Sequence, residues 1–283
     1  AEEYASGKGI NCSRVLQNRG GEPLRVHVLG SDHGSRIFDE ISGCGISQAP
    51  IWIKEPTRTC TTIACGGEAT ELIEPSPVLT DIENKDFAQT LGEYWNTAQC
   101  VALCGSFPGN FDVECINGLD FTGKRVFVDA IENIDSWLEK GVELLKINMH
   151  EYSKLLDRMG IPQVKSSPQF WKMTATAVLE RLTIKNLVVT DEESPVRAFR
   201  LVEKKFQSAI VTPPAVEVQN SVGAGDSFFA GWLYADSMGL EFEECLVKST
   251  AVAVARCEVD KPWMLSLERV AELEETIRES LEQ

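Results

Sequence analysis

The sequence predicts an α/β fold in which helices cover both faces of a mainly parallel central sheet. From residue 81 onward, short apolar segments typical of buried strands alternate with segments typical of helices. Strands that are apolar along their whole length belong to parallel sheets that are buried on both faces. A chain of 283 residues can bury a substantial core, so one large domain, alone or with a small one, is expected.

The start of the chain predicts one helix followed by a strand and a second helix. A helix is expected after Gly7, ending near Gly20, because Cys12, Val15 and Leu16 fall on one side of it. The next two elements are predicted as a strand over 24–29 and a helix over 31–41.

A β-hairpin is predicted between residues 58 and 73. The segments 58–65 and 68–73 have the composition of strands, and two glycines at 66–67 separate them. We expect residues 51–53 to join this hairpin in one small sheet, which would form a lid over a ligand site.

The remaining elements follow from the alternation of helix and strand. Helices are predicted for 82–95, 113–118, 134–140, 168–182, 228–238, from 242 onward and for 267–281, and strands for 100–104, 126–129, 143–147, 187–190, 197–201 and 215–218. In such folds, ligands bind beyond the carboxyl ends of the strands. The last helix is acidic and amphipathic, which predicts a solvated outer layer.

Charge and composition narrow the class of protein. The formal net charge is -16 and the isoelectric point is near 4.7, which argues against binding to nucleic acid or to an anionic membrane. No apolar run reaches membrane-spanning length, and the first residues lack the pattern of a signal peptide. The nine cysteines are scattered without a Cys-x-x-Cys pair, which indicates reduced thiols in the cytoplasm and argues against a structural zinc site.

The stretch Asn220–Gly231 carries the strongest chemical signal. A Gly-Ala-Gly turn stands where a helix begins, and the unpaired amides and positive dipole of a helix start favour an anion. Gly223 and Gly225 allow a phosphate to approach the backbone closely. Asp226 would repel a phosphate, so we interpret it as a general base that faces a substrate hydroxyl. The alternative is an aspartate that caps the helix.

The run Asn-x-Val-Gly-Ala-Gly-Asp-Ser resembles the signature of the ribokinase-like (pfkB) sugar kinases. It is most similar to the branch of 1-phosphofructokinases and tagatose-6-phosphate kinases. The resemblance implies a ribokinase-like three-layer α/β/α sandwich with a small β-sheet lid. It also implies that Asp226 is the catalytic base and that Gly223, Ala224 and Gly225 form an anion hole.

Further motifs resemble the same family in the same order. Ser6-Gly7-Lys8-Gly9-x-Asn11 is similar to the turn that grips the sugar. Gly7 is therefore expected to let the substrate approach the backbone closely, Asn11 to bind hydroxyls and Lys8 to neutralise a substrate phosphate. Thr57-Arg58 is similar to the Thr-Arg pair whose guanidinium binds the substrate phosphate. Glu71-x-x-Glu74-Pro75 is similar to the run that closes the lid. Ser106, in Gly-Ser-Phe-Pro, is expected near the substrate. Taken alone, Lys8 and Arg58 also fit a solvated surface.

A pair of oxygen-bearing residues follows the strand over 143–147. Lys146-Ile147-Asn148-x-x-Glu151 resembles the family's Lys-Pro-Asn-x-x-Glu motif, with Ile147 in place of Pro. Asn148 and Glu151 can face one point, and oxygen ligands of this kind hold Mg²⁺ beside nucleotide phosphates, often through water. Lys146 would add a positive charge. The alternative is a helix cap in which Asn148 and Glu151 bond to each other's backbone.

The resemblance fails after the strand over 187–190. The family has a glycine turn under the nucleotide phosphates at this point, whereas this chain has Thr190-Asp191-Glu192-Glu193-Ser194-Pro195. Thr190 is retained for cofactor binding, but three carboxylates near an ATP tail would repel it. An outward-turned loop or Mg²⁺ would relieve the repulsion.

These features predict an enzyme, a carbohydrate kinase that uses ATP and Mg²⁺. We expect transfer of the γ-phosphoryl group to a phosphorylated ketohexose such as fructose 1-phosphate or tagatose 6-phosphate. A main domain is predicted over 1–45 and 76–283 and a lid over 46–75, incomplete because the family's opening segment is absent from the sequence shown. The sequence also allows a homodimer that forms through the lid. The alternatives are a kinase of free sugars or nucleosides and a sugar-phosphate-binding homologue with impaired ATP use.

Overall fold

The computed structural model describes residues 2–65, 68–163 and 169–282. Within this part of the chain, contacts separate two compact units. The smaller unit comprises Ala1–Ala5, Pro23–Ala98 and Ser106–Asp120, and the larger comprises Ser6–Glu22, Gln99–Gly105 and Phe121–Gln283. The predicted lid over 46–75 falls within the smaller unit, and its role remains a prediction.

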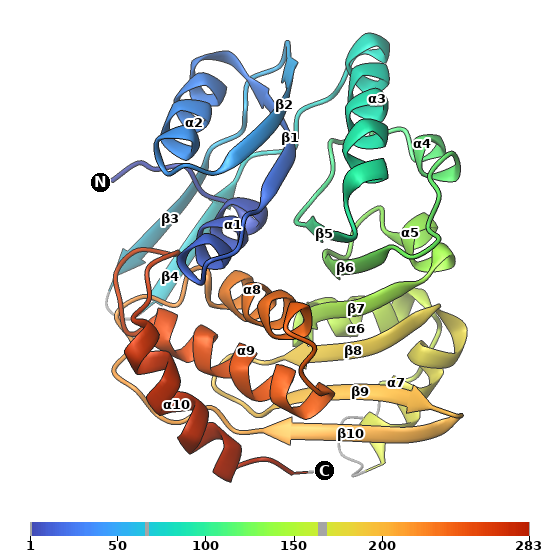
Figure 1. Ribbon diagram of the computed structural model, residues 1–283, viewed down its shortest axis with the longest axis vertical. Helices are drawn as coiled ribbons and strands as arrows, with labels where there is room; N and C mark the ends of the chain where they lie inside the picture. The colour runs from blue at the N-terminus through green and yellow to red at the C-terminus, as the bar shows by residue number, and fades with distance from the viewer. Residues whose placement is uncertain (1, 66–67, 164–168, 283) are drawn as a thin grey trace. The chain divides into compact units, whose positions relative to one another are not determined.

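The larger unit is built on a six-stranded sheet with the order β10-β9-β8-β7-β6-β5 (Figure 1). Its strands are β5 (Cys100–Cys104), β6 (Arg125–Asp129), β7 (Val142–Asn148), β8 (Ile184–Thr190), β9 (Val196–Val202) and β10 (Lys205–Val211). Strands β5 to β8 run parallel, and β9 and β10 are each antiparallel to their neighbour. The mainly parallel central sheet predicted from the sequence is confirmed.

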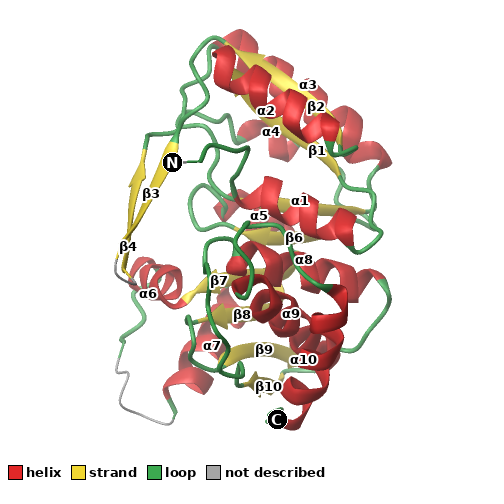
Figure 2. Ribbon diagram, turned by 90° about the vertical axis from the view of Figure 1, so that its left-hand side faces the viewer, coloured by secondary structure: helices red, strands yellow, loops and turns green. Residues whose placement is uncertain are grey.

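Helices cover both faces of this sheet, as Figure 2 shows. Helices α6 (Met149–Arg158) and α7 (Phe170–Arg181) pack on one face. The opposite side holds α1 (Lys8–Asn18), α8 (Ala224–Ser237), α9 (Phe242–Cys257) and α10 (Leu267–Glu279). The short helix α5 (Asp135–Lys140) connects β6 and β7. Four parallel strands end at one edge, so the loops after β5, β6, β7 and β8 lie together there.

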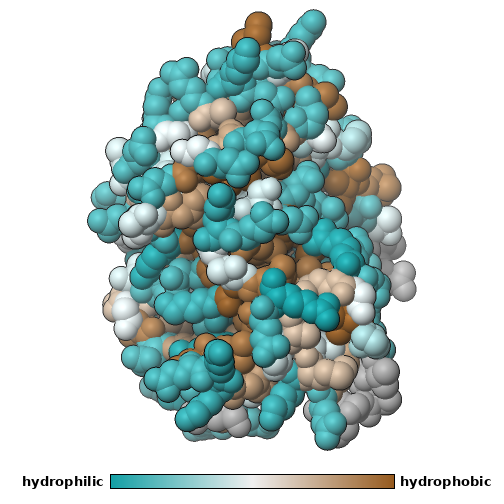
Figure 3. Space-filling view, turned by 90° about the vertical axis from the view of Figure 1, so that its right-hand side faces the viewer, coloured by the Kyte–Doolittle hydropathy of each residue, from teal (hydrophilic) through white to brown (hydrophobic). Residues whose placement is uncertain are grey.

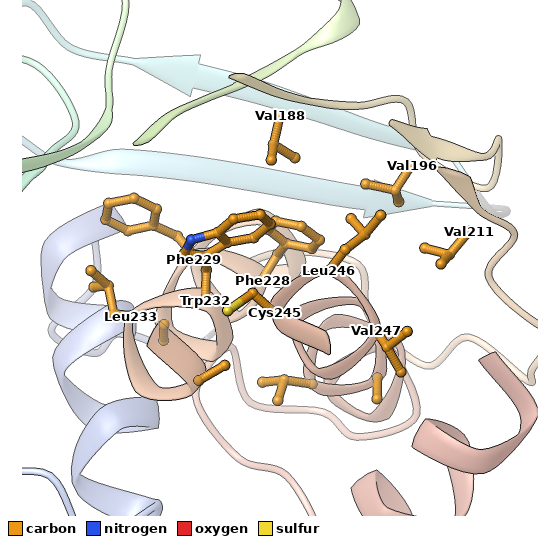
Figure 4. Packing of buried hydrophobic residues seen from close by; sticks show 14 of the residues in the cluster. Val188, Val196, Val211, Phe228, Phe229, Trp232, Leu233, Cys245, Leu246 and Val247 are labelled. Atoms are coloured by element: carbon orange, nitrogen blue, oxygen red, sulfur yellow. The ribbon is translucent and has the colours of Figure 1, made fainter. Parts of the chain in front are cut away.

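Helix α8 is buried almost all round, because it packs against both α1 and α9 while also facing the sheet. Phe228, Phe229 and Trp232 lie between the helices and the strands that carry Val188 and Val196 (Figure 4). Each of these aromatic side chains is at most 2% exposed. Full burial of one such side chain stabilises the fold by roughly 1.5–3 kcal/mol, so the start of α8 is held rigidly.

The smaller unit contains a β-α-β arrangement and a separate hairpin. Its elements are β1 (Leu24–Gly30), α2 (Ser31–Gly43), β2 (Ser47–Ile53), β3 (Cys60–Cys65), β4 (Glu68–Ile73), α3 (Asp81–Thr97) and α4 (Glu114–Asn117). Strands β3 and β4 pair antiparallel, which confirms the predicted strands of the hairpin. The two-glycine turn at 66–67 lies outside the described residues.

The expectation that residues 51–53 join the hairpin is wrong. Among the described residues, β2 pairs along its whole length with β1, in parallel, and β3–β4 forms its own two-stranded sheet. The physical reason is the crossover through α2, because a strand-helix-strand connection brings the two strands side by side in parallel. Alternate residues Ala49, Ile51 and Ile53 are buried, so β2 needs the cover of its own helices.

The predicted strand over 215–218 is also absent: this segment forms neither helix nor strand in the structure. Its valines alternate with Ala215 and Glu217, but Val218 is exposed. The backbone amides of Gln219 and Asn220 bond to the Cys257 carbonyl instead of a neighbouring strand. Alternation without a buried face does not make a strand.

None of the helices in the described part of the chain is both long and apolar enough to cross a membrane. Hydrophilic side chains cover most of the face drawn in Figure 3, in agreement with the charge of the sequence.

Candidate active site

The Gly-Ala-Gly turn forms the start of α8 as predicted. Gly223 precedes the helix with φ of +84°, a left-handed conformation that favours glycine. A Cβ at Gly223 would lie 2.6 Å from the Pro262 carbonyl oxygen, so a side chain is excluded for a second reason. The Ala224 amide donates to the Ser221 carbonyl at 3.1 Å, which closes the turn. This geometry presents a helix N-terminus of the kind that binds anions.

Asp226 lies in the first turn of α8 and is only 8% exposed. Its Oδ2 accepts a hydrogen bond from Asn11 Nδ2 at 2.8 Å. Burial raises the pKa of the Asp226 carboxyl above its ordinary value, and the negative charge of Asp129 raises it further. The Asn11 hydrogen bond and the ammonium groups of Lys146 and Lys8 oppose this pKa shift. A buried carboxylate with a raised pKa has the properties of a general base.

Helix α1 presents Lys8 and Asn11 from the same face, because they are three residues apart. Gly7 precedes the helix with φ of +124°, and a Cβ there would meet no atom within 4 Å, so its backbone is open to a ligand. The Ser6 hydroxyl donates to Asn11 Oδ1 at 3.3 Å. The structure thus brings Asn11 directly to Asp226, a contact that the sequence did not predict.

Lys8 is bound to carboxylates of its own unit. Its Nζ lies 2.8 Å from Asp129 Oδ1 and 3.3 Å from Glu151 Oε1. Burial acts to lower the pKa of Lys8, but the charges of Asp129 and Glu151 outweigh it and hold the pKa above its ordinary value. Lys8 therefore keeps its positive charge and joins the turn at Gly7 to the motif at Glu151.

Asp129 was missed by the sequence analysis. It ends β6, is 1% exposed, and contacts both Lys8 and Lys146, whose Nζ lies 3.3 Å from Asp129 Oδ2. Its backbone carbonyl accepts the Gly105 amide at 2.9 Å. The available signal was a single acidic residue at the end of an apolar strand, at the sheet edge where Lys146 also falls.

Asn148 and Glu151 form the helix cap that the sequence offered as the alternative to a metal site. The Glu151 amide donates to Asn148 Oδ1 at 2.8 Å, and the Asn148 amide donates to Glu151 Oε2 at 2.9 Å. Over the described ranges, no group of three or more His, Cys, Asp or Glu residues is arranged to hold a metal ion. The oxygens of both residues suit Mg²⁺ that keeps most of its water shell and also binds phosphates.

The acidic turn after β8 directs its glutamates outward. Thr190 ends β8 beside Asn148 of β7, at the predicted sheet edge. The Ser194 amide donates to the Asp191 carbonyl at 2.8 Å, and Glu192 adopts φ of +48° within this turn. Glu192 and Glu193 are both exposed. The turn thus has the left-handed residue expected of a glycine turn, with a glutamate in that place.

In the smaller unit, Arg58 and Ser106 lie together, and Ser76 joins them. Arg58 Nη1 donates to Ser76 Oγ at 3.0 Å and Nη2 donates to Ser106 Oγ at 2.9 Å. The two hydroxyls are 3.4 Å apart. A guanidinium with two hydroxyls is a group of donors suited to a phosphate. Ser76, which no motif singled out, is the second residue that the sequence analysis missed.

Comparison with known proteins identifies the family to which the chain belongs. The model of the pfkB family of carbohydrate kinases matches residues 1–262, so the chain belongs to that family. Membership in a kinase family implies ATP as a substrate. The family and enzyme class predicted from the sequence are confirmed.

Individual proteins agree with this assignment. The chain is 27% identical over 234 residues to a tagatose-6-phosphate kinase of Staphylococcus epidermidis. The aligned region covers 80% of this chain and 73% of that protein. Phosphofructokinase-2 from Escherichia coli, solved with substrates and products, has a TM-score of 0.82 at 21% identity and covers 96% of this chain and 88% of its own. Ribokinase from Thermotoga maritima has a TM-score of 0.72 at 20% identity, covering 95% and 87%. The two structures show that the fold is ribokinase-like.

Proposed function

We propose that the protein transfers the γ-phosphoryl group of ATP to a hydroxyl of a phosphorylated ketohexose, such as fructose 1-phosphate or tagatose 6-phosphate. The observation that carries this proposal is the buried Asp226 carboxylate, held by Asn11 at the N-terminus of a helix that begins with a glycine turn. A base beside an anion site is what transfer of a phosphoryl group to a hydroxyl requires.

The site residues of the larger unit divide the work of this reaction among them. Asp226 accepts the proton of the attacking hydroxyl, while the turn at Gly223, Ala224 and Gly225 holds the transferring group. Lys146 lies beside that turn, since a Cβ on Gly225 would be 2.8 Å from its Nζ, and it offsets the charge that develops during transfer. Mg²⁺ held through water by Asn148 and Glu151 would neutralise charge on the nucleotide phosphates.

Arg58, Ser76 and Ser106 support a phosphorylated acceptor in place of a free sugar. A free sugar offers neutral hydroxyls, whereas the guanidinium and two hydroxyls form an arrangement for a charged oxyanion. The relative named as a tagatose-6-phosphate kinase supports the same substrate class. The outward direction of Glu192 and Glu193 supports binding of ATP, because exposed charges are screened by solvent.

A homodimer through the β3–β4 hairpin and a cytoplasmic location belong to the same proposal. Ile63 and Leu72 lie on one face of the hairpin and are 51% and 56% exposed. A two-stranded sheet that exposes apolar residues gains stability by pairing with a second copy. Sedimentation of Ile63→Asn is expected to show monomers, whereas Met173→Asn, a control that is equally exposed on α7, stays dimeric. Monomeric wild-type protein would contradict the dimer.

Calorimetric titration with ATP·Mg²⁺ and with fructose 1-phosphate tests the function directly. Both ligands are expected to bind, and a coupled assay is then expected to show turnover with sugar phosphates and little with the matching free sugars. Binding of the sugar phosphate without ATP would support a binding protein instead. Faster turnover of a free sugar would leave the kinase class intact and show that the acceptor is wrong.

A further inference from the structure

A single buried carboxylate lies between the two lysines of the site. Asp129 Oδ1 contacts Lys8 Nζ at 2.8 Å, and Asp129 Oδ2 contacts Lys146 Nζ at 3.3 Å. The Asp129 side chain is 1% exposed and that of Lys146 is 4% exposed. Lys8 comes from α1 and Lys146 from β7, so this one residue joins two motifs that are far apart in the sequence.

We infer that Asp129 is a positioning residue for phosphoryl transfer, whose carboxylate holds the ammonium groups of Lys8 and Lys146 at fixed points beside Asp226. This inference rests on the proposed function. Asp129 influences the reaction only through the positions of the two lysines and through its own charge.

Electrostatics favour a shared carboxylate at this point. Two ammonium groups that lie near one another repel, and burial of Lys146 adds a desolvation cost. One carboxylate that contacts both groups offsets these costs and allows both to stay charged. Among the described residues, Lys8 pairs with a second carboxylate, that of Glu151. Over the same residues, Lys146 forms its one ion pair with Asp129. Lys146 therefore depends on Asp129 more strongly than Lys8 does.

Both lysines also lie close to residues that contact or adjoin the base. Lys8 and Asn11 extend from the same turn of α1, and Asn11 bonds to Asp226 at 2.8 Å. Lys146 lies against Gly225, one residue before Asp226. The carboxylate of Asp129 thus connects two groups that lie near the base, and the Asp129 backbone carbonyl also accepts the amide of Gly105. Catalysis through preformed charges requires such fixed positions.

The test is a double-mutant cycle with Asp129→Asn and Lys146→Met. Asp129→Asn keeps the shape of the side chain and removes its charge. We expect kcat to fall about 10²-fold, the loss typical for removal of a preformed electrostatic contact. The Kd values for ATP and sugar phosphate, measured by calorimetry, are expected to change much less than kcat. In the Lys146→Met background the same substitution should lower kcat by a clearly smaller factor, because the two residues act as a unit.

Stability and control variants separate this role from a purely structural one. Asp129→Asn leaves a buried lysine without its counter-ion, so its melting temperature should fall, and Asp129→Asn/Lys146→Met should recover melting temperature but not kcat. Asp135→Asn, the same change at an exposed position in the next helix, should leave kcat unchanged. If Asp129→Asn does not fold, the comparison of Lys146→Met with the double variant still measures what Asp129 does through Lys8, and a fall in kcat of the double variant is then expected.

Three results would overturn the inference. The first is a kcat of Asp129→Asn equal to that of Asp135→Asn. The second is an equal loss of kcat in both backgrounds, which indicates that Asp129 acts independently of Lys146. The third is equal kcat values for Lys146→Met and the double variant where the single variant does not fold. Wild-type protein without any kinase turnover would instead refute the proposed function, and the inference with it.

Discussion

Replacement of Glu192 by glycine tests whether the acidic turn after β8 hinders the nucleotide. Glu192 has φ of +48° and an exposed side chain. Two effects are combined in this residue: backbone strain from a left-handed conformation and a negative charge near the sheet edge. Glu192→Gly removes both, whereas Glu192→Gln removes only the charge. The pair of variants therefore separates the two effects.

The magnitudes follow from the conformation and the exposure. A left-handed conformation costs a non-glycine residue roughly 1–2 kcal/mol. The extra conformational freedom of glycine in the unfolded chain destabilises the fold by about 0.5–1 kcal/mol and so offsets part of the gain from removing this strain. Glu192→Gly should thus stabilise the fold by about 0.5–1 kcal/mol, or roughly 1–4 °C. A solvated carboxylate about 8 Å from a phosphate contributes about 0.5 kcal/mol per charge before salt screening. Loss of the charge should therefore lower the Kd for ATP by less than about threefold.

The assays are thermal unfolding and calorimetric titration with ATP·Mg²⁺ at physiological ionic strength. Glu192→Gly is expected to melt above wild type, and Glu192→Gln at the wild-type temperature. Both should bind ATP only slightly more tightly than wild type. A tenfold or larger gain in ATP affinity in Glu192→Gln would refute the reasoning, because it would mean that the carboxylate faces the nucleotide. Equal melting temperatures for all three proteins would refute the strain argument.

Three further predictions concern the anion turn, the phosphate site and the base. Gly223→Ala is expected to lose about 2–4 kcal/mol of stability in urea unfolding, because the new side chain clashes with Pro262 and the left-handed conformation is strained. The control is Gly239→Ala, which should lose only about 1 kcal/mol, because Gly239 has φ of +73° but open space around it. Equal losses in the two variants would exclude the clash. Arg58→Met should raise the KM for sugar phosphate by roughly 10–100-fold without changing the Kd for ATP; a KM within twofold of wild type would exclude Arg58 from the site. Burial raises the pKa of Asp226 in the folded state, so the native protein holds the proton of this carboxyl more tightly than the unfolded chain does. Ionisation of Asp226 therefore lowers the stability of the fold as pH rises through the window between the ordinary and the raised pKa. Asp226→Asn should therefore be the more stable protein at neutral pH, and the opposite order would contradict the direction of the pKa shift.

The sequence predicted those elements whose side chains carry an unambiguous pattern. Strands β6, β7 and β8 each contain a short run of apolar residues, and α8 begins at a glycine turn, so both the type and the place of these elements could be predicted. The edge of the sheet that holds the site followed from the parallel order of these strands alone.

Strand β10 was missed because its hairpin lacks the usual turn residues. The loop between β9 and β10 has two residues, Glu203 and Lys204, and both have positive φ. A turn with this geometry normally carries Asn-Gly or a similar pair, and neither residue here gives that signal. Packing against the rest of the sheet, which no local pattern reports, stabilises the strained turn.

The sequence offered individual candidate residues for the site, but not the contacts between them. Asn11, Asp226, Lys8 and Lys146 were identified from separate motifs, and only the fold shows that Asn11 bonds to Asp226. Asp129 belongs to no motif, so its contacts with two lysines depend on tertiary structure. Asn148 and Glu151 fit a cap and a metal site equally well by sequence, since both roles use the same oxygens.

The most direct test of the central claim is a single-turnover measurement with Asp226→Asn. Radioactive γ-phosphate transfer from ATP to the sugar phosphate would be followed at saturating concentrations of both ligands, after calorimetry has shown that the variant binds them. Loss of a general base is expected to slow transfer by at least about 10²–10⁴-fold, with binding retained. Transfer within tenfold of the wild-type rate would contradict the assignment of Asp226 as the base.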